Sequence, residues 1–264
     1  MRVMIMTDLE GASGVVTFAD YTGPDSRYYG MAKRLLTGEV NAAVEALTAE
    51  GVEDVLVIDG HGCGGIVPEM LRPPARLMHG GASFLTDGAK GLYPTYDAMM
   101  MIGQHAMAGT PEGNLCHTQS STSITYYKLN GQMIGETAQW ALFCGHFGVP
   151  LIFLSGDHAA CAEAEALVPG IVTAAVKRGL ARESAISIAP EAAQELIRRQ
   201  VRQAVRNHRH RPLPPVKMDP PYELEVRFTD AQHATNALAG GRWEKVDDRT
   251  VRRRAQDIVS IIYG

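Results

Sequence analysis

Four short apolar runs, each stopped abruptly by polar residues or glycine, constrain the fold of this chain more than any other feature. They are residues 2–6, 55–58, 98–102 and 149–154. Short runs of this kind are typical of β-strands. Between the first two runs, the apolar residues from Met31 to Leu47 recur at intervals of three and four, which indicates a helix. A strand, a helix and a second strand in succession predict an α/β fold with a mainly parallel, helix-covered sheet.

Two predicted helices and one predicted loop follow further along the chain. Residues 136–147 and 190–207 have helical spacing, and Pro190 suits the first turn of the second of these helices. The arginines of that helix lie mostly opposite its apolar face, so we interpret them as a solvated surface. The stretch "RHRPLPPVKMDPP", residues 209–221, contains too many prolines for regular structure and predicts a loop or linker.

The segments after this loop predict a second, smaller α/β unit. In "YELEVRF", residues 222–228, apolar and charged side chains alternate, as they do in a half-exposed strand. Residues 249–264 predict a strand followed by a helix. We therefore expect a larger α/β domain over residues 1–160 and a smaller α/β unit over residues 161–264. No change in composition marks the boundary, and one compact domain is the alternative.

Composition and charge argue against several classes of partner. The chain of 264 residues is 45% hydrophobic and 20% charged, as in ordinary globular proteins, and its net charge is −4. This charge gives no electrostatic reason to expect a nucleic-acid partner. No run approaches the roughly 18 apolar residues of a membrane span, and the first residues do not resemble an export signal. We therefore expect no membrane partner. The four cysteines show no C-x-x-C spacing, so we expect reduced thiols and a cytoplasmic location.

Residues that can bind metals follow three of the predicted strands. "TDLEG" supplies Asp8 and Glu10, "DGHG" supplies His61, and "GQHA" supplies His105. Positions two apart on a strand point the same way, so the two carboxylates repel each other unless a positive charge lies between them. In parallel sheets, ligands bind beyond the carboxyl ends of the strands. Imidazoles and carboxylates at neighbouring strand ends therefore predict a site for a divalent transition metal.

Two further residues have more than one interpretation. His117 lies in the polar stretch "NLCHTQSSTS", where it is either an exposed loop histidine or part of the site. Glu136 begins a predicted helix, where its charge either stabilises the helix dipole or joins the site. The pattern of residues alone leaves both alternatives open.

Five motifs, "TDLEG", "DGHG", "GQHA", "CHTQS" and "IGET", resemble in order and spacing the DppA-like zinc D-aminopeptidases, a family of self-compartmentalising metallopeptidases. The similarity continues through "GDHAACAEAEALVPGIVTAAVKRGLAR" and covers nearly the whole chain. The resemblance implies that His117 is catalytic without being a ligand. It also implies five metal ligands: Asp8, Glu10, His61, His105 and Glu136. Met6 departs from the family's pattern, which has serine there, and this puts the hydrogen bonding or shape of the pocket in doubt.

By this resemblance, the chain is expected to remove the N-terminal residue, a D-amino acid such as D-alanine, from short peptides or amides. Two zinc ions per subunit and a homodecamer of stacked pentamers are implied as well. Charge supports the ligand set, because three carboxylates and two neutral imidazoles oppose the four positive charges of two divalent ions and leave one for a hydroxide. His117 would then carry the proton, because the pKa of imidazole lies near working pH.

Two local motifs permit other interpretations. Gly60, Gly62 and Gly65 form a literal G-x-G-x-x-G after a predicted strand, but the prolines that follow leave no room for a dinucleotide-binding helix. Cys63 and Cys116 lie next to histidines, yet structural zinc sites place cysteines in pairs, which this chain lacks. We therefore expect tight glycine turns and unpaired thiols at these positions.

The function also has alternatives. The same fold could act on L-residues or glycine, because no motif describes the pocket walls that set handedness. A metal-stabilised binding or scaffold protein would keep the ligands but would not need His117. Asp157 and His158 follow the strand predicted at 149–154 and either orient ligands or form a polar turn into a helix.

Overall fold

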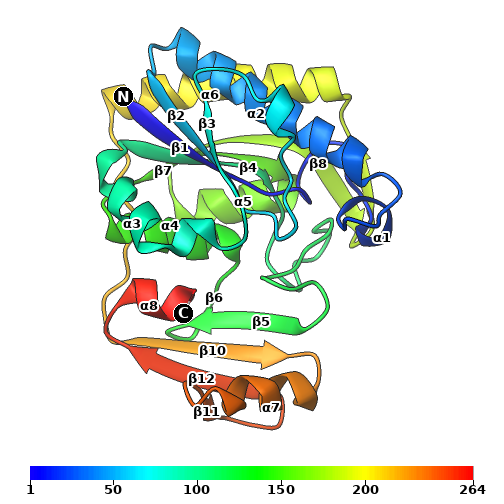
Figure 1. The fold of residues 1–264 in the computed structure, drawn as a ribbon, viewed down its shortest axis with the longest axis vertical. Helices are drawn as coiled ribbons and strands as arrows, with labels where there is room; N and C mark the ends of the chain where they lie inside the picture. The colour runs from blue at the N-terminus through cyan, green and yellow to red at the C-terminus, as the bar shows by residue number, and fades with distance from the viewer. Residues whose placement is uncertain (264) are drawn as a thin grey trace.

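The computed structural model describes residues 1–263, which are built around a seven-stranded sheet of order β3-β2-β1-β4-β7-β8-β9 (Figure 1). All neighbouring strands are parallel except the pair β8 and β9, so the predicted mainly parallel sheet is confirmed. The strands are β1 (Arg2–Thr7), β2 (Asp54–Asp59), β3 (Arg76–Met78), β4 (Ala98–Gln104), β7 (Leu151–Asp157), β8 (Val172–Ala181) and β9 (Ser184–Ser187). The four apolar runs of the sequence form four of these strands.

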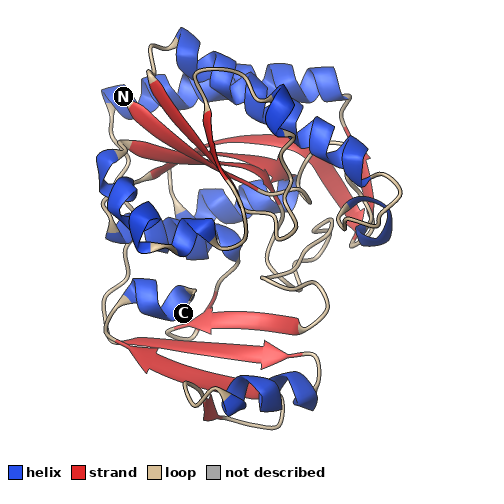
Figure 2. Ribbon diagram, viewed as in Figure 1, coloured by secondary structure: helices blue, strands red, loops and turns tan. Residues whose placement is uncertain are grey.

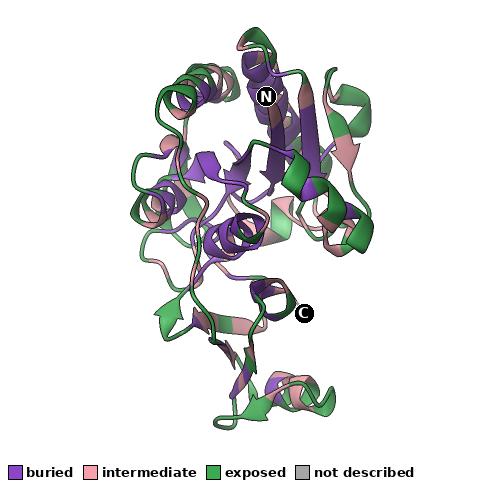
Figure 3. Ribbon diagram, turned by 90° about the vertical axis from the view of Figure 1, so that its left-hand side faces the viewer, coloured by how far each residue is buried: buried purple, intermediate pink, exposed green. Residues whose placement is uncertain are grey.

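Helices cover both faces of this sheet (Figure 2). One face packs against α2 (Tyr29–Ala49) and α6 (Pro190–His210), and this layer forms one apolar core. The other face packs against α3 (Asp87–Leu92), α4 (Glu136–His146) and α5 (His158–Leu167), which form a second core. The strands of this sheet are mostly buried between the two layers (Figure 3). Four short helical segments complete the larger unit: α1 (Phe18–Tyr21), η1 (Pro68–Met70), η2 (Ser83–Leu85) and η3 (Tyr93–Thr95).

A smaller antiparallel sheet of order β11-β12-β10-β5-β6 forms the second unit (Figure 1). Its strands are β5 (Ile124–Leu129), β6 (Gln132–Met133), β10 (Tyr222–Phe228), β11 (Glu244–Lys245) and β12 (Thr250–Ala255). The helices α7 (Ala231–Ala239) and α8 (Ile258–Ile262) pack against it, and apolar residues of α4 join its core. The alternating strand at 222–228 and the final strand and helix are thus confirmed.

The two sheets do not divide the chain at one point. The strands β8 and β9 follow residue 160 but belong to the larger sheet, whereas β5 and β6 precede it and belong to the smaller one. The division into domains at residue 160 stays a prediction. The smaller unit therefore takes strands from two segments that are far apart in the sequence.

The parallel register brings the carboxyl ends of β1, β2 and β4 together. Thr7 pairs with Asp59 on one side and with Ile102 on the other, so the three strands end almost level. The loop after β1 then lies against the end of β4, since a Cβ atom on Gly11 would be 2.1 Å from the carbonyl oxygen of Gln104. Only glycine permits so close an approach. The segments that carry the predicted metal ligands consequently meet at one edge of the sheet.

Two negative expectations can be compared with this fold. The glycines after β2 lead into the short η1 and then β3, so the dinucleotide-binding arrangement, in which a long helix follows, is not formed. Within residues 1–263, none of the helices has both the length and the apolar character that crossing a membrane requires.

Candidate metal centre

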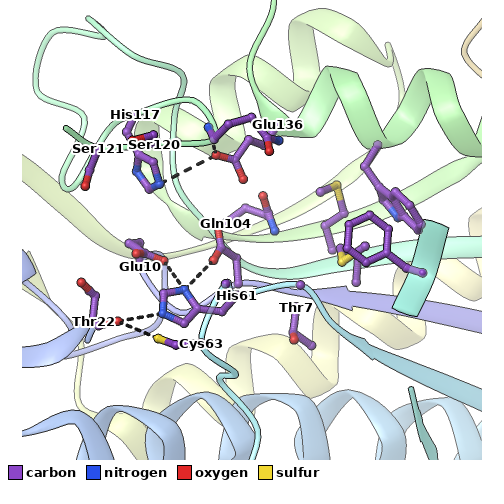
Figure 4. A pocket seen from close by; sticks show the side chains of 18 of the residues that line it. Thr7, Glu10, Thr22, His61, Cys63, Gln104, His117, Ser120, Ser121 and Glu136 are labelled. Carbon is purple, nitrogen blue, oxygen red and sulfur yellow. Dashed lines mark hydrogen bonds and ion pairs between the residues drawn. The ribbon is translucent and has the colours of Figure 1, made fainter. Parts of the chain in front are cut away.

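The structure brings all six predicted site residues together at the carboxyl edge of the larger sheet. Figure 4 labels four of them, Glu10, His61, His117 and Glu136. Five of them line one cleft of about 400 Å³: Asp8, Glu10, His61, His117 and Glu136. The sixth, His105, is buried behind them and is 2% exposed. They come from the loops after β1, β2 and β4, from the segment before β5 and from the first residue of α4.

Asp8 lies at the centre of this cluster. Its Oδ1 atom is 3.4 Å from Nδ1 of His61, and its Oδ2 atom is 3.0 Å from Nε2 of His105. Glu10 Oε2 lies 3.1 Å from the same nitrogen of His61, and Glu136 Oε1 lies 3.7 Å from Nε2 of His105. The two oxygens of Asp8 thus face two separate groups of donor atoms. This arrangement suits a carboxylate that bridges two cations.

Backbone carbonyl groups fix the orientation of the two histidines. His61 donates from Nε2 to the carbonyl oxygen of Thr22 at 2.9 Å, and His105 donates from Nδ1 to that of Ala106 at 2.9 Å. A neutral imidazole has one N–H, so the nitrogen that faces the carboxylates carries a lone pair. Lone pairs of nitrogen and oxygen repel at these distances unless a cation lies between them. Among residues 1–263, the buried atoms Glu10 Oε2 and His105 Nε2 lie 3.1 Å and 3.0 Å from His61 Nδ1 and Asp8 Oδ2 without a well-aligned hydrogen bond, as metal-ligand atoms would.

The pKa shifts indicate an excess of buried negative charge. Burial lowers the pKa of His105, but the carboxylates of Glu136 and Asp8 outweigh it and raise that pKa to about 10. The pKa of His61 is likewise raised, because Glu10 and Asp8 outweigh the effect of burial. Burial raises the pKa of Glu136 to about 7, against the attraction of His105. The cluster therefore stabilises added positive charge, which divalent cations supply to deprotonated ligands.

His117 lies at the edge of the cleft rather than on an exposed loop. Its ring stacks on that of His105, with centroids 3.9 Å apart and planes inclined by 15°. Its Nδ1 atom is 2.9 Å from the carbonyl oxygen of Leu115, and its Nε2 atom is 3.8 Å from Glu136 Oε1. Burial and the neighbouring His105 lower its pKa to about 3. The lowered pKa keeps the ring neutral, contrary to the expectation of a pKa near working pH, so Nε2 carries a free lone pair at the edge of the cleft.

Sequence reasoning missed three residues of the site. Thr22 orients His61 through its carbonyl group, and the backbone N–H of Gln119 donates to Glu136 Oε1 at 2.6 Å. Both act through the backbone, which leaves no signal in the side-chain pattern. Gln104 lines the cleft and stands inside the motif "GQHA", where only the adjacent histidine was singled out.

The structure also bears on the remaining local alternatives. Asp157 accepts hydrogen bonds from the N–H groups of Ala159 at 3.2 Å and Gly179 at 3.0 Å, so it caps α5 as part of a polar turn. Neither Cys63 nor Cys116 belongs to a group of potential metal-binding side chains among the described residues. Both cysteines are free thiols, as expected.

Two buried ionisable side chains hold the loop after β1. Lys177 Nζ donates to the carbonyl oxygens of Glu10 and Val15, and Glu39 Oε1 accepts from the N–H of Ser13 at 2.8 Å. Both side chains are almost completely buried. They fix the backbone from Glu10 to Val15, directly after the carboxylates of the cluster, and Glu39 does so without lining the cleft.

Glu39→Gln is expected to remove a pH dependence of stability. Burial raises the pKa of Glu39 from 4.5 to about 7, so the folded state holds a proton that the unfolded state releases. The free energy of unfolding should therefore fall by about 3 kcal/mol as pH rises from 4.5 to beyond 7. Chemical denaturation at pH 5 and pH 8 measures this. The variant should lose that part of the fall, and equal falls in both proteins would contradict the assignment.

Three comparisons with known proteins agree with this geometry. A family model described as D-aminopeptidase matches residues 1–263. A D-aminopeptidase of Bacillus subtilis (strain 168) is 30% identical over 264 residues, which cover 98% of this chain and 93% of that protein. The solved structure of the Zn-dependent D-aminopeptidase DppA from Bacillus subtilis, a self-compartmentalizing protease, has a TM-score of 0.89 at 28% identity. It covers 99% of this chain, and the match spans 94% of that one.

Proposed function

Because the chain belongs to the D-aminopeptidase family and is thus a metallo-aminopeptidase, we propose that its carboxylate and histidine cluster holds two zinc ions and hydrolyses the N-terminal peptide bond of short peptides. The observation that carries this proposal is Asp8, whose two oxygens face two different histidines. The proposed ligands are Asp8, Glu10, His61, His105 and Glu136. Zinc bound to them would polarise the scissile carbonyl group and lower the pKa of a water molecule.

The protein's own residues then have distinct tasks. The carboxylates would neutralise three of the four positive charges of two zinc ions and so hold these ions in the buried site. His117 is proposed to take a proton at Nε2 from the attacking water molecule and to give it to the leaving amine, because its Nδ1 atom is engaged by the carbonyl oxygen of Leu115. The stacked ring of His105 keeps this imidazole in place. Nε2 is thus the atom of His117 that would carry the proton at the edge of the cleft.

We further propose a D-amino acid, D-alanine among them, as the N-terminal residue removed. The support is the family together with the sequence and structure matches in Bacillus subtilis, both of which are described as a D-aminopeptidase. Zinc-loaded protein assayed on matched D-alanyl and L-alanyl peptides and amides, with zinc measured on the same sample, tests this. We expect hydrolysis of the D-series at least about 100-fold faster than of the L-series.

Two other outcomes of this assay are informative. Faster hydrolysis of L-alanyl or glycyl peptides would show the same chemistry with different specificity. An intact, zinc-loaded protein that hydrolyses none of the panel would favour a metal-stabilised binding or scaffold protein. The second outcome would overturn the proposed peptidase function.

We also propose a homo-oligomer, a decamer of two stacked pentamers, in the cytoplasm. The relative DppA is a self-compartmentalizing protease, and here the edge hairpin of β8 and β9 exposes Leu180 and Ile186 by 54% and 61%. Four free cysteines support the reducing compartment. Light scattering should give a mass ten times that of the 28.5 kDa chain, and a monomer at micromolar concentration would contradict the assembly.

A further inference from the structure

Beside the carboxylate and histidine cluster, the cleft has an apolar end. We call this end the apolar subsite, and it consists of five residues: Met6, Phe84, Met101, Trp140 and Tyr263. The whole cleft measures about 400 Å³, which lies within the range of roughly 300–1,000 Å³ typical of small-molecule sites. The cleft thus has room for more than the reacting groups of a peptide.

The periodicity of the elements places the subsite next to the cluster. Met6 precedes Asp8 by two residues, and Trp140 follows Glu136 by one turn of α4. Residues two apart on a strand and four apart on a helix share a face. Met6 also pairs in register with Met101 of β4, so the two methionines form a floor on one face of the sheet. Segments that carry proposed ligands therefore also carry the apolar wall.

Three aromatic rings complete this wall. The ring of Phe84 meets that of Trp140 edge to face at 5.6 Å and that of Tyr263 at 5.7 Å, both with planes inclined by 85°. These rings come from η2, from α4 and from the residue after α8. Edge-to-face contacts hold aromatic rings in defined positions. None of the five residues is charged, so a charged group that entered this end would lose its hydration without gaining a partner.

Gln104 stands at the polar border of the subsite. Figure 4 shows it between Glu136 and the pair formed by His61 and Glu10. Its side chain lines the cleft and is 2% exposed, and Oε1 has no hydrogen-bond partner within residues 1–263. A buried acceptor left unpaired is unfavourable, and an N–H donor on a bound ligand would offset this cost. The α-amine of a peptide is such a donor, and binding it here orients the adjacent side chain.

We propose that the apolar subsite receives the side chain of the N-terminal residue, with Gln104 accepting a hydrogen bond from its amine. The enzyme then prefers branched or aromatic apolar residues to alanine and rejects charged ones. This inference rests on the proposed aminopeptidase function and names its substrate class. A methyl group leaves most of such a pocket unfilled, and each added methylene in an apolar pocket changes specificity by about 10-fold or more.

The test uses the zinc-loaded protein and p-nitroanilides of D-alanine, D-leucine, D-phenylalanine and D-lysine. We expect kcat/KM for the leucine and phenylalanine compounds to exceed that for the alanine compound by about 10-fold or more, with the lysine compound slowest. Phe84→Ala should reduce the ratio of kcat/KM for the leucine compound to kcat/KM for the alanine compound by about 10-fold. Phe147→Ala is the matched control, because Phe147 packs in the same aromatic cluster without lining the cleft.

Binding provides a readout that does not require turnover. D-leucinol and D-alaninol carry the amine and the side chain but no scissile bond, and Trp140 reports their binding by fluorescence once Trp243→Phe removes the other tryptophan. D-leucinol should bind about 10-fold more tightly than D-alaninol. If D-leucinol binds more tightly while no anilide is hydrolysed, the apolar subsite is supported and the proposed peptidase function is wrong. Hydrolysis with equal or better use of alanine, together with equal binding of the two amino alcohols, would overturn the subsite.

Discussion

Replacing His117 with alanine is expected to lower kcat by about 10²–10⁴-fold while the zinc content per chain stays unchanged. The imidazole stacks on His105 at the edge of the cleft and keeps Nε2 free, so its loss removes the proposed proton carrier. The proposed ligands His61 and His105 keep their own hydrogen bonds to Thr22 and Ala106. Steady-state kinetics on a D-alanyl substrate and zinc analysis of the same sample measure the two effects.

The matched control is His146→Ala, which removes an imidazole at the far end of α4, outside the cluster. This variant should retain both activity and zinc. Because His117 Nε2 lies only 3.8 Å from Glu136 Oε1, its donor atoms could also serve a metal. A parallel loss of zinc and activity in the His117 variant would therefore make this residue a ligand and would leave the proton carrier unassigned.

Asp8→Asn is expected to remove at least one zinc ion per chain and to lower kcat/KM by about 10³-fold or more. The carboxylate faces His61 with one oxygen and His105 with the other, and an amide cannot place negative oxygens on both sides. Asparagine has nearly the same shape, so the packing of the loop after β1 should be kept. Zinc analysis, kinetics and thermal unfolding of the metal-free variant together test this.

A carboxylate elsewhere on the same sheet supplies the comparison. Asp54 begins β2 and pairs with Arg2 and Arg76 at the opposite end of the strand. Asp54→Asn should keep the full zinc content and activity. If Asp8→Asn retained two zinc ions and normal turnover, the bridging role of Asp8 would be wrong.

The sequence predicts the larger sheet well because each of its central strands is a short apolar run with an abrupt end. The strands β1, β2, β4 and β7 and the helices α2, α4 and α6 lie where periodicity places them. The smaller sheet could not be assembled from the sequence. Its strand β5 at Ile124–Leu129 is half-exposed and mixed in polarity, and its partner β10 lies about ninety residues further along the chain. Pairing over such a separation leaves no local pattern.

The site could be predicted to a similar depth. Asp8, Glu10, His61 and His105 follow strands that end together, so the carboxyl ends of a parallel sheet suffice to bring them close. His117 and Glu136 lie on segments whose places depend on the chain path between the two sheets, and only the family resemblance favours the site over the alternative interpretation of each residue. The apolar subsite has no sequence signal, because methionine and tryptophan in strands and helices are ordinarily core residues.

Anomalous diffraction at the zinc edge from crystals of the zinc-loaded protein shows directly whether the carboxylate and histidine cluster holds two zinc ions. We expect two peaks a few ångströms apart, with Asp8 between them and with Glu10, His61, His105 and Glu136 as the other protein ligands. Zinc bound only outside this cluster would contradict the proposed metal centre. A cluster that stays free of metal in crystals of an active enzyme would contradict it as well.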